Sequence, residues 1–346
     1  MSNHAQINDD HATAVNFTTS DTAHFNDMRP RINIATALNS LYMRYTYVML
    51  TSLFTNQTGA DIHVYLLHSD LSDEEQECLQ SLAQSYGHTI HYLHIDRKSF
   101  PVELPTTQMW SLESYYRLVL LDILPAEVDR LLYFDVDMII NKPILDLYKT
   151  DFEGSYFCAC KDMTVSFPMS DIRDEIFKEH IAAGFTYFNS GLMLWNVAAL
   201  RGKYSFKDYM ELAEELEYKM LAPDQDLLNY MHWDQIKFVD EYRYNLFSRM
   251  AYANGVRYEQ AREEAVIVHY AGMKPWQGQY IHYDIEKLWW DYAKQTIFYM
   301  ELMEEFQQAC LGDPWVYDKV KVLSEGITKS QALCKQLAQM LEQNRN

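Results

Sequence analysis

The stretch Leu131-Leu-Tyr-Phe-Asp-Val-Asp-Met-Ile-Ile140 predicts a buried β-strand that is interrupted by two acids, Asp135 and Asp137. A carboxylate inside a dry sheet is strongly unfavourable unless a cation or a hydrogen-bond donor compensates it. The two acids must therefore lie where the strand ends, near a cleft, or hold a cation. Residues i and i+2 of an extended chain point to the same side, and paired carboxylate oxygens suit Mg2+ or Mn2+.

The acidic pair is not specific by itself. Such pairs are common in a chain with 49 Asp and Glu among 346 residues, and Asp224-Gln-Asp226 is a second one. The apolar strand before Asp135 and the proline at Pro143 are the features that favour a metal site here. Proteins that hold a divalent ion by one or two carboxylates usually complete its shell with substrate phosphates. The pattern therefore predicts an ion that binds a phosphorylated substrate.

Length, charge and cysteine content exclude several classes of protein. A chain of 346 residues can form one large domain, or one domain with an appendage, around an extensive core. The net charge of -20 argues against nucleic acid as a partner, because that binding depends on neutralising phosphates. The five cysteines form no even disulfide framework. No signal-peptide pattern or membrane-length apolar run is found, so we expect a cytoplasmic protein without a transmembrane segment.

Strands and helices are expected to alternate over the first part of the chain. The expected strands are 31–37, 62–67 and 89–95, a helix follows each of the first two, and another helix is expected over 110–121. This order, with short connections, predicts an α/β, Rossmann-like fold with a mostly parallel central sheet and helices on both faces. Ligands bind such sheets beyond the carboxyl ends of the strands, which is where Asp135 and Asp137 are expected.

Later segments offer more polar groups near strand ends. Arg117 interrupts the apolar face of its helix and would lie either at the surface or in the cleft. Asn189-Ser-Gly191 begins an apolar strand and is either an ordinary turn or a carboxamide site for a hydroxyl-rich ligand. His269 lies near the end of an expected strand over 266–270 and precedes Gly272 and Lys274. It is therefore either a core histidine or part of a corner that binds metal and phosphate.

Four motifs in this order resemble the glycosyltransferases of family 8, which include bacterial lipooligosaccharide galactosyltransferases and the glycogenins. They are Leu131-Leu-Tyr-Phe-Asp-Val-Asp137, Phe188-Asn-Ser-Gly-Leu192, Asp224-Gln-Asp-Leu-Leu-Asn229 and His269-Tyr-Ala-Gly-Met-Lys-Pro-Trp276. The resemblance implies a GT-A fold, with UDP-glucose or UDP-galactose as donor and Mn2+, or else Mg2+, as the metal. It also implies transfer of the hexose, with retention of anomeric configuration, to a glycan or glycoprotein acceptor.

The resemblance also assigns roles to single residues. Asp135, Asp137 and His269 are similar to the family's metal ligands, and a nitrogen ligand beside two carboxylates suits Mn2+ better than Mg2+. The residues similar to those that bind the donor nucleotide are Ala37, Asn39, Tyr42, Arg117, Asp135, Val136, Asn189, Gly272 and Lys274. The residues similar to those around the reacting sugar are Asp162, Asp224 and Gln225.

One segment departs from the family pattern. Family members usually carry Asp-Asp-Asn-Tyr after the first strand, where this chain has Ala37-Leu-Asn-Ser-Leu-Tyr42. Asn39 can hydrogen-bond a base or ribose without adding charge, and Tyr42 can stack on uracil. The departure keeps a non-catalytic glycan- or partner-binding protein as an alternative. A metal-dependent sugar nucleotidyltransferase is a further alternative, but it would need a Gly-rich, basic loop that the sequence lacks after the first strand.

The two ends of the chain are expected to differ from the domain between them. Residues 1–30 are polar and without periodicity and predict a disordered tail, residues 31–292 the GT-A domain, and residues 293–346 a small helical extension. The segment 328–343 predicts an amphipathic helix whose polar face is not basic, as a membrane-binding helix would require. We expect this helix to pack on its own domain or on a second copy of the chain, which would form a homo-oligomer.

Overall fold

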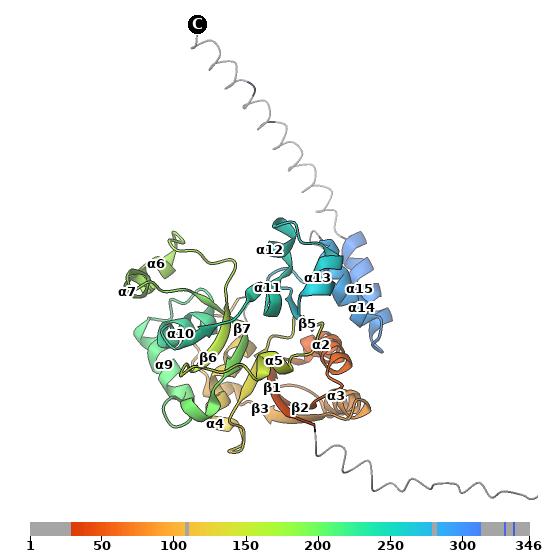
Figure 1. Ribbon diagram of the computed structural model, residues 1–346, viewed down its shortest axis with the longest axis horizontal. Coiled ribbons are helices and arrows are strands. Elements are labelled where there is room, and N and C mark those ends of the chain that lie inside the picture. The colour runs from red at the N-terminus through yellow and green to blue at the C-terminus, as the bar shows by residue number, and fades with distance from the viewer. Residues whose placement is uncertain (1–28, 108–110, 279–281, 313–328, 330–334, 336–346) are drawn as a thin grey trace, which may run out of the picture.

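The structure is a computed structural model that describes residues 29–107, 111–278 and 282–312 together with residues 329 and 335. A twisted central sheet carries helices on both faces, and a smaller lobe of helices lies beside one end of it (Figure 1). The tail predicted over 1–30 lies almost wholly outside the described residues, and so does the helix predicted over 328–343.

The central sheet is mostly parallel, as the alternation of strands and helices predicts. Its seven strands, in spatial order, are β3 (Thr89–His94), β2 (Asp61–His68), β1 (Arg31–Ala37), β4 (Leu131–Phe134), β7 (Phe188–Trp195), β6 (Phe157–Lys161) and β8 (Ile236–Phe238). Among the described strands of this sheet, β7 alone runs antiparallel to both its neighbours. The carboxyl ends of β1 and β4 therefore lie at the same edge of the sheet as the start of β7.

The stretch 131–140 does not form the single strand that its apolar residues predict. β4 ends at Phe134, the chain turns over residues 135–137, and β5 (Met138–Ile140) joins a second sheet. That sheet has three strands in the order β5, β10 (Ile267–His269) and β9 (Leu246–Phe247). The run is apolar because it consists of two buried strands of different sheets. Its two acids occupy the turn between them, where cations can reach them.

Two helical layers cover the central sheet. The layer on one face consists of α2 (Met43–Asn56) and α3 (Asp73–Ser85), and the opposite layer of the 3-10 helix η3 (Leu112–Val119), α4 (Leu120–Ile123), α9 (Phe206–Glu215) and α10 (Pro223–His232). Alternate residues of a strand face opposite layers, so Ile34 packs with α2 and Ala35 with η3. A capping box of Ser72 and Glu75 begins α3, as predicted. The helix predicted over 110–121 is mostly 3-10 in character.

Short helices complete the fold. They are η1 (Ser40–Tyr42), η2 (Arg97–Ser99), α5 (Leu145–Tyr148), α6 (Ile172–Ile176), α7 (Lys178–Ala182), α8 (Val197–Leu200), α11 (Glu241–Tyr244), α12 (Ser248–Ala253), α13 (Tyr258–Glu264) and η4 (Asp284–Glu286). The C-terminal region is helical, as predicted, with α14 (Lys287–Ala293) and α15 (Tyr299–Gly312) beside α13 and α2 (Figure 1). The buried side chains of Trp289 and Leu302 join both helices to the core. Among the described residues, no helix has the length and apolar character needed to cross a membrane.

Candidate functional site

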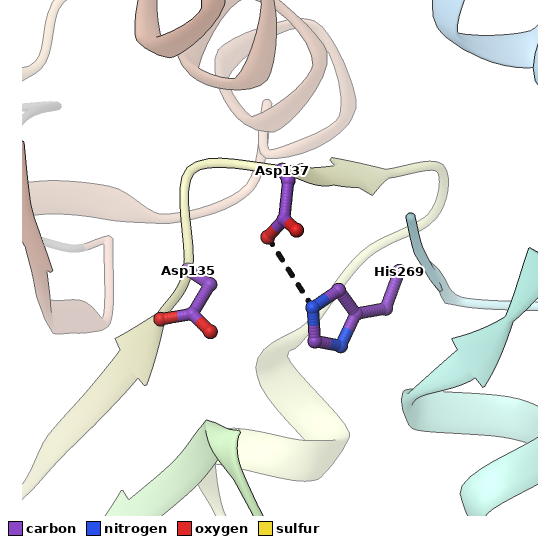
Figure 2. Close-up of side chains that lie close together, drawn as sticks. All are labelled: Asp135, Asp137 and His269. Carbon is purple, nitrogen blue, oxygen red and sulfur yellow. Dashed lines mark ion pairs between the residues drawn. The ribbon is translucent and has the colours of Figure 1, made fainter. Parts of the chain in front are cut away.

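Asp135, Asp137 and His269 bring together three groups that could hold a metal ion (Figure 2). Each offers one ligand atom, and these atoms all lie within 4.8 Å of one another. His269 Nε2 is 3.2 Å from Asp137 Oδ1. The acids come from the turn between β4 and β5, and the histidine ends β10, which pairs with β5. Two carboxylates and an imidazole form a donor set that suits a divalent transition ion, so the residues fit the metal that the family resemblance implies.

Gly191 allows this cluster to approach the backbone of β7. A Cβ atom at position 191 would lie 2.6 Å from Asp135 Oδ2 and 2.7 Å from His269 Cε1. Asp135 N donates a hydrogen bond of 2.8 Å to Gly191 O, which fixes the turn against β7. The glycine of Asn189-Ser-Gly191 therefore provides the close backbone approach that the sequence suggests, and any side chain there would displace two of the metal-binding groups.

Arg117 is buried behind the cluster and does not lie at the surface, the first of the two predicted locations. Its Nη2 is 2.7 Å from Asp135 Oδ1, and its Nε is 3.0 Å from Asp224 Oδ2. Its Nη1 also donates to the carbonyl oxygen of Ser190 at 2.5 Å. Burial acts against its charge, but Asp135 and Asp224 hold the pKa of Arg117 above its ordinary value. Arg117 is thus a fixed cation that orients Asp135.

Asp162, Asn189 and Gln225 form a hydrogen-bonded group next to Arg117. Asn189 Nδ2 donates to Gln225 Oε1 at 2.9 Å and to Asp162 Oδ2 at 3.3 Å. Gln225 Nε2 donates to the same Asp162 oxygen at 3.1 Å. Asp162 directly follows β6, Asn189 lies at the start of β7, and Gln225 lies in the first turn of α10. Carboxylate and carboxamide groups gathered in this way can exchange these bonds for the hydroxyl groups of a sugar.

The two acids of Asp224-Gln-Asp226 have different surroundings. Asp224 faces Arg117 and accepts a hydrogen bond of 3.1 Å from Ser190 Oγ. Burial raises the pKa of Asp224 to about 6, although Arg117 opposes the rise. Asp226 accepts from the backbone N–H groups of residues 221 and 222 at 2.8 and 2.9 Å, and from the hydroxyl of Tyr187. Asp226 therefore holds the start of α10, which is a structural role.

Lys274 places an ammonium group against Asp137. Its Nζ donates to Asp137 Oδ2 and, at 3.2 Å, to the carbonyl oxygen of Tyr270. Although burial acts to raise it, the charges of Lys274 and His269 hold the pKa of Asp137 well below its ordinary value. The intervening turn contains Gly272 with φ +87°, a conformation that glycine adopts readily. A phosphate next to this cluster would therefore meet a second positive charge.

The residues predicted to bind the nucleoside follow β1. Ala37 ends the strand, and the buried Oδ1 atom of Asn39 has no hydrogen-bond partner among the described residues. That oxygen can accept a hydrogen bond from a base. Tyr42 packs edge-on against Trp276, with ring centroids 6.4 Å apart. The side chain of Val136 packs in the core shared by β1 and α2, so a contact between this residue and a ligand would come from its backbone.

Asn245 is a site residue that the sequence does not single out. Its Oδ1 is 2.9 Å from His269 Nδ1, and its Nδ2 donates to Asn189 Oδ1 at 2.9 Å. Because an amide oxygen only accepts, Nδ1 of His269 donates this hydrogen bond, and Nε2 faces the two acids. Every metal-binding histidine needs a partner for its second nitrogen. This requirement is the only feature of the sequence that could have pointed to Asn245. It does not say which residue is the partner, and Asn245 lies 24 residues before His269.

Comparison of the sequence with known proteins points to one family. Residues 33–279 match the family described as "Glycosyl transferase family 8". A lipopolysaccharide 1,2-glucosyltransferase of Escherichia coli is 27% identical over 257 residues, 72% of this chain and 74% of that protein. A lipopolysaccharide 1,3-galactosyltransferase of Salmonella typhimurium is 24% identical over 249 residues, 71% of this chain and 73% of that protein. A Haemophilus influenzae relative is 26% identical, and this chain spans 63% of its length.

Solved structures share the fold. The galactosyltransferase LgtC, crystallised with donor and acceptor sugar analogues, aligns with a TM-score of 0.62 and 21% identity, covering 77% of this chain and 96% of LgtC. The glycosyltransferase GlyE of Streptococcus pneumoniae aligns with a TM-score of 0.61 and 19% identity, covering 82% of this chain and 64% of GlyE. The α/β, GT-A fold predicted from the sequence is thereby confirmed.

Proposed function

The chain belongs to glycosyl transferase family 8, and from that premise we propose that it is a metal-dependent, retaining hexosyltransferase with a UDP-sugar donor and a glycan or glycoprotein acceptor. The observation that carries the proposal is the cluster of Asp135, Asp137 and His269 beside the ammonium group of Lys274. The cluster combines ligands for an ion with a cation for a diphosphate. UDP-glucose and UDP-galactose are the proposed donors, because two relatives are a glucosyltransferase and a galactosyltransferase.

The charged residues prepare the site for a diphosphate. Asp135, Asp137 and His269 would hold the metal, and their donor set favours Mn2+. When bound, the ion supplies positive charge that neutralises the departing diphosphate. Lys274 provides a second cation, already placed against Asp137. Arg117 keeps Asp135 in place from behind, and preorganised charge of this kind is often the largest contribution to catalysis.

The residues around the donor sugar favour attack by the acceptor itself. Gln225 carries a carboxamide, which is a poor nucleophile, and both its side-chain oxygen and its nitrogen are hydrogen bonded. Asp224 is held by Arg117 and Ser190. We therefore propose that the acceptor hydroxyl attacks the anomeric carbon on the face from which UDP leaves. The new C–O bond forms as the bond to phosphate breaks, the electron pair leaves with UDP, and a donor phosphate oxygen takes the hydroxyl proton.

Asn39 supports uridine as the nucleoside. Its buried Oδ1 lacks a partner among the described residues, and uracil offers a ring N–H that can fill this place. The departure from the acidic family motif would then change the charge of the nucleoside site but keep a hydrogen-bond acceptor. A non-catalytic binding protein has less support, because the charged cluster and the group of Asp162, Asn189 and Gln225 are both assembled.

The Asp137→Ala variant tests this proposal. Calorimetric titration with UDP should show binding by the native chain that requires Mn2+ and is lost in EDTA. The variant should lose the metal-dependent part of UDP binding together with transfer, while its circular dichroism spectrum remains native. Asp73→Ala, which removes an exposed acid from α3, is the matched control and should bind as the native chain does. Near-normal turnover by Asp137→Ala would show that the metal-centred proposal is wrong.

A further inference from the structure

Arg249 is an exposed arginine next to the site, and none of the groups described above includes it. It makes no hydrogen bond, ion pair or ring contact with the residues that the structure describes. Its Nη1 lies 3.3 Å from the point where a Cβ atom on Gly272 would stand. Two other arginines differ from it: Arg117 binds two acids, and Arg243 lies over the ring of Tyr244. Arg249 thus offers an uncompensated guanidinium beside the turn that carries Lys274.

The backbone before Arg249 is tied to the metal-binding histidine at three points. β9 pairs with β10, which places Phe247 opposite His269. The ring of Phe247 meets the imidazole edge to face, with centroids 5.0 Å apart, and Asn245 is hydrogen bonded to its Nδ1. α12 begins directly after β9, so Arg249 stands just beyond the carboxyl end of that strand. Its Cα is therefore held at a fixed place beside the site, while its side chain extends into solvent.

The surroundings of Arg249 suit an anion that arrives from solvent. Lys274 and Arg117 already bind carboxylates of the metal cluster, whereas Arg249 has no carboxylate partner among the described residues. Gly272 contributes no side chain in front of the guanidinium. In a chain with a net charge of -20, an exposed cation without a partner attracts anions locally. A guanidinium binds phosphate and carboxylate groups through paired hydrogen bonds.

We propose that Arg249 recognises an anionic group, a phosphate or a carboxylate, on the acceptor. This inference rests on the proposed transferase function, because it takes the acceptor to reach the donor past the turn at Gly272. Arg249 would then select charged acceptors over neutral ones. A hydrogen bond to a charged group changes affinity by about tenfold to a hundredfold.

Calorimetry of the full-length protein, loaded with UDP and Mn2+, tests the proposal. The phosphate probes are glucose 6-phosphate and galactose 6-phosphate, the carboxylate probes are glucuronate and galacturonate, and glucose and galactose are the neutral references. We expect one class of charged sugar to bind about tenfold more tightly than its neutral reference. Arg249→Gln should abolish that preference, and Arg249→Lys should keep part of it. Arg243→Gln, which removes an exposed arginine from α11, is the matched control and should keep all of it.

Four results would overturn the inference. The native chain could bind charged and neutral sugars equally or bind none of them, or Arg249→Gln could keep the preference. A loss of UDP affinity in Arg249→Gln as large as the loss of charged-sugar affinity would assign Arg249 to the donor instead. Release of UDP from UDP-sugars by the native chain is measured in parallel. If that release is absent while charged sugars still bind through Arg249, the anion site stands and the proposed transferase activity fails.

Discussion

At the scale of single residues, Gly191 leaves little room for change. A methyl group at this position would lie 2.6 Å from Asp135 Oδ2 and 2.7 Å from His269 Cε1, so two metal-binding groups would have to move. We expect Gly191→Ala to weaken Mn2+ binding at least tenfold and to lower the free energy of unfolding by about 1–3 kcal/mol. Gly59→Ala is the control, because a Cβ at Gly59 meets no atom within 4 Å. Native Mn2+ affinity in Gly191→Ala, measured by calorimetry, would contradict this account of the cluster.

Asp224 gives a prediction about pH. Burial raises its pKa from the ordinary value of 3.8 to about 6, so the folded chain binds this proton more tightly than the unfolded chain. The contribution of Asp224 therefore favours folding below about pH 4 and is lost as the pH rises through about 6. Two pKa units correspond to about 3 kcal/mol.

The Asp224→Asn variant isolates that contribution, because its amide resembles the protonated acid. Between about pH 4 and pH 7, the native chain should lose about 3 kcal/mol of unfolding free energy relative to Asp224→Asn. Urea unfolding of both proteins at a series of pH values measures the difference. A difference that does not change with pH would show that the pKa of Asp224 is not raised.

The sequence predicts which residues belong to the candidate site better than it predicts which of them contact one another. The unfavourable burial of Asp135 and Asp137 predicts that both need a cation or a hydrogen-bond donor, whatever the fold. The sequence leaves two locations for Arg117, since an arginine on an apolar face can reach either water or a buried acid. Arg117 forms an ion pair with Asp224, which lies on a helix that begins about a hundred residues later in the chain. The local hydrophobic pattern around Arg117 carries no information about so distant a partner.

At the scale of elements, the turn between β4 and β5 is the feature that local sequence misses. Two short buried strands in succession have the same apolar pattern as one longer strand. They separate because β4 pairs with β1 and β7, whereas β5 pairs with β10, which is far away in the sequence. The separation brings His269 to the acids, so the pairing that sequence analysis could not predict is the one that assembles the cluster.

The pairing of β9 with β10 makes Asn245 a positioning residue. Its amide oxygen accepts from His269 Nδ1 and fixes the orientation of the imidazole. Loss of such a partner typically lowers metal affinity by about 10-fold to 100-fold, and we expect this range for Asn245→Ala. Mn2+ titration measures it, with Asn254→Ala, an exposed asparagine after α12, as the control. Equal Mn2+ affinity of the two variants would indicate that Asn245 has only a packing role.

At the scale of the whole molecule, the C-terminal helices are part of the folded core. The boundary predicted after residue 292 falls within α14, and Leu302 on α15 is 1% exposed beside Trp289. Leu302→Ala should lower the free energy of unfolding by about 2–5 kcal/mol. Leu311→Ala on the same helix removes a side chain that is 87% exposed and should leave stability nearly unchanged. Equal thermal unfolding of both variants would mean that α15 does not stabilise the domain.

The order of elements predicts the α/β architecture because each strand and helix has its own hydrophobic period. It does not predict that residues from β4, β7, α10 and β10 meet at one edge, which depends on the antiparallel course of β7 and on the second sheet. Four separate motifs and the family they resemble supply that information. We propose that these motifs assemble a metal-dependent site for a UDP-sugar.

Release of UDP from a panel of UDP-sugars, measured with Mn2+ and without acceptor, tests that claim most directly. We expect slow hydrolysis of UDP-glucose or UDP-galactose that stops in EDTA and in Asp137→Ala. If no donor in the panel were hydrolysed and UDP failed to bind in calorimetry, the chain would not be a metal-dependent UDP-sugar transferase.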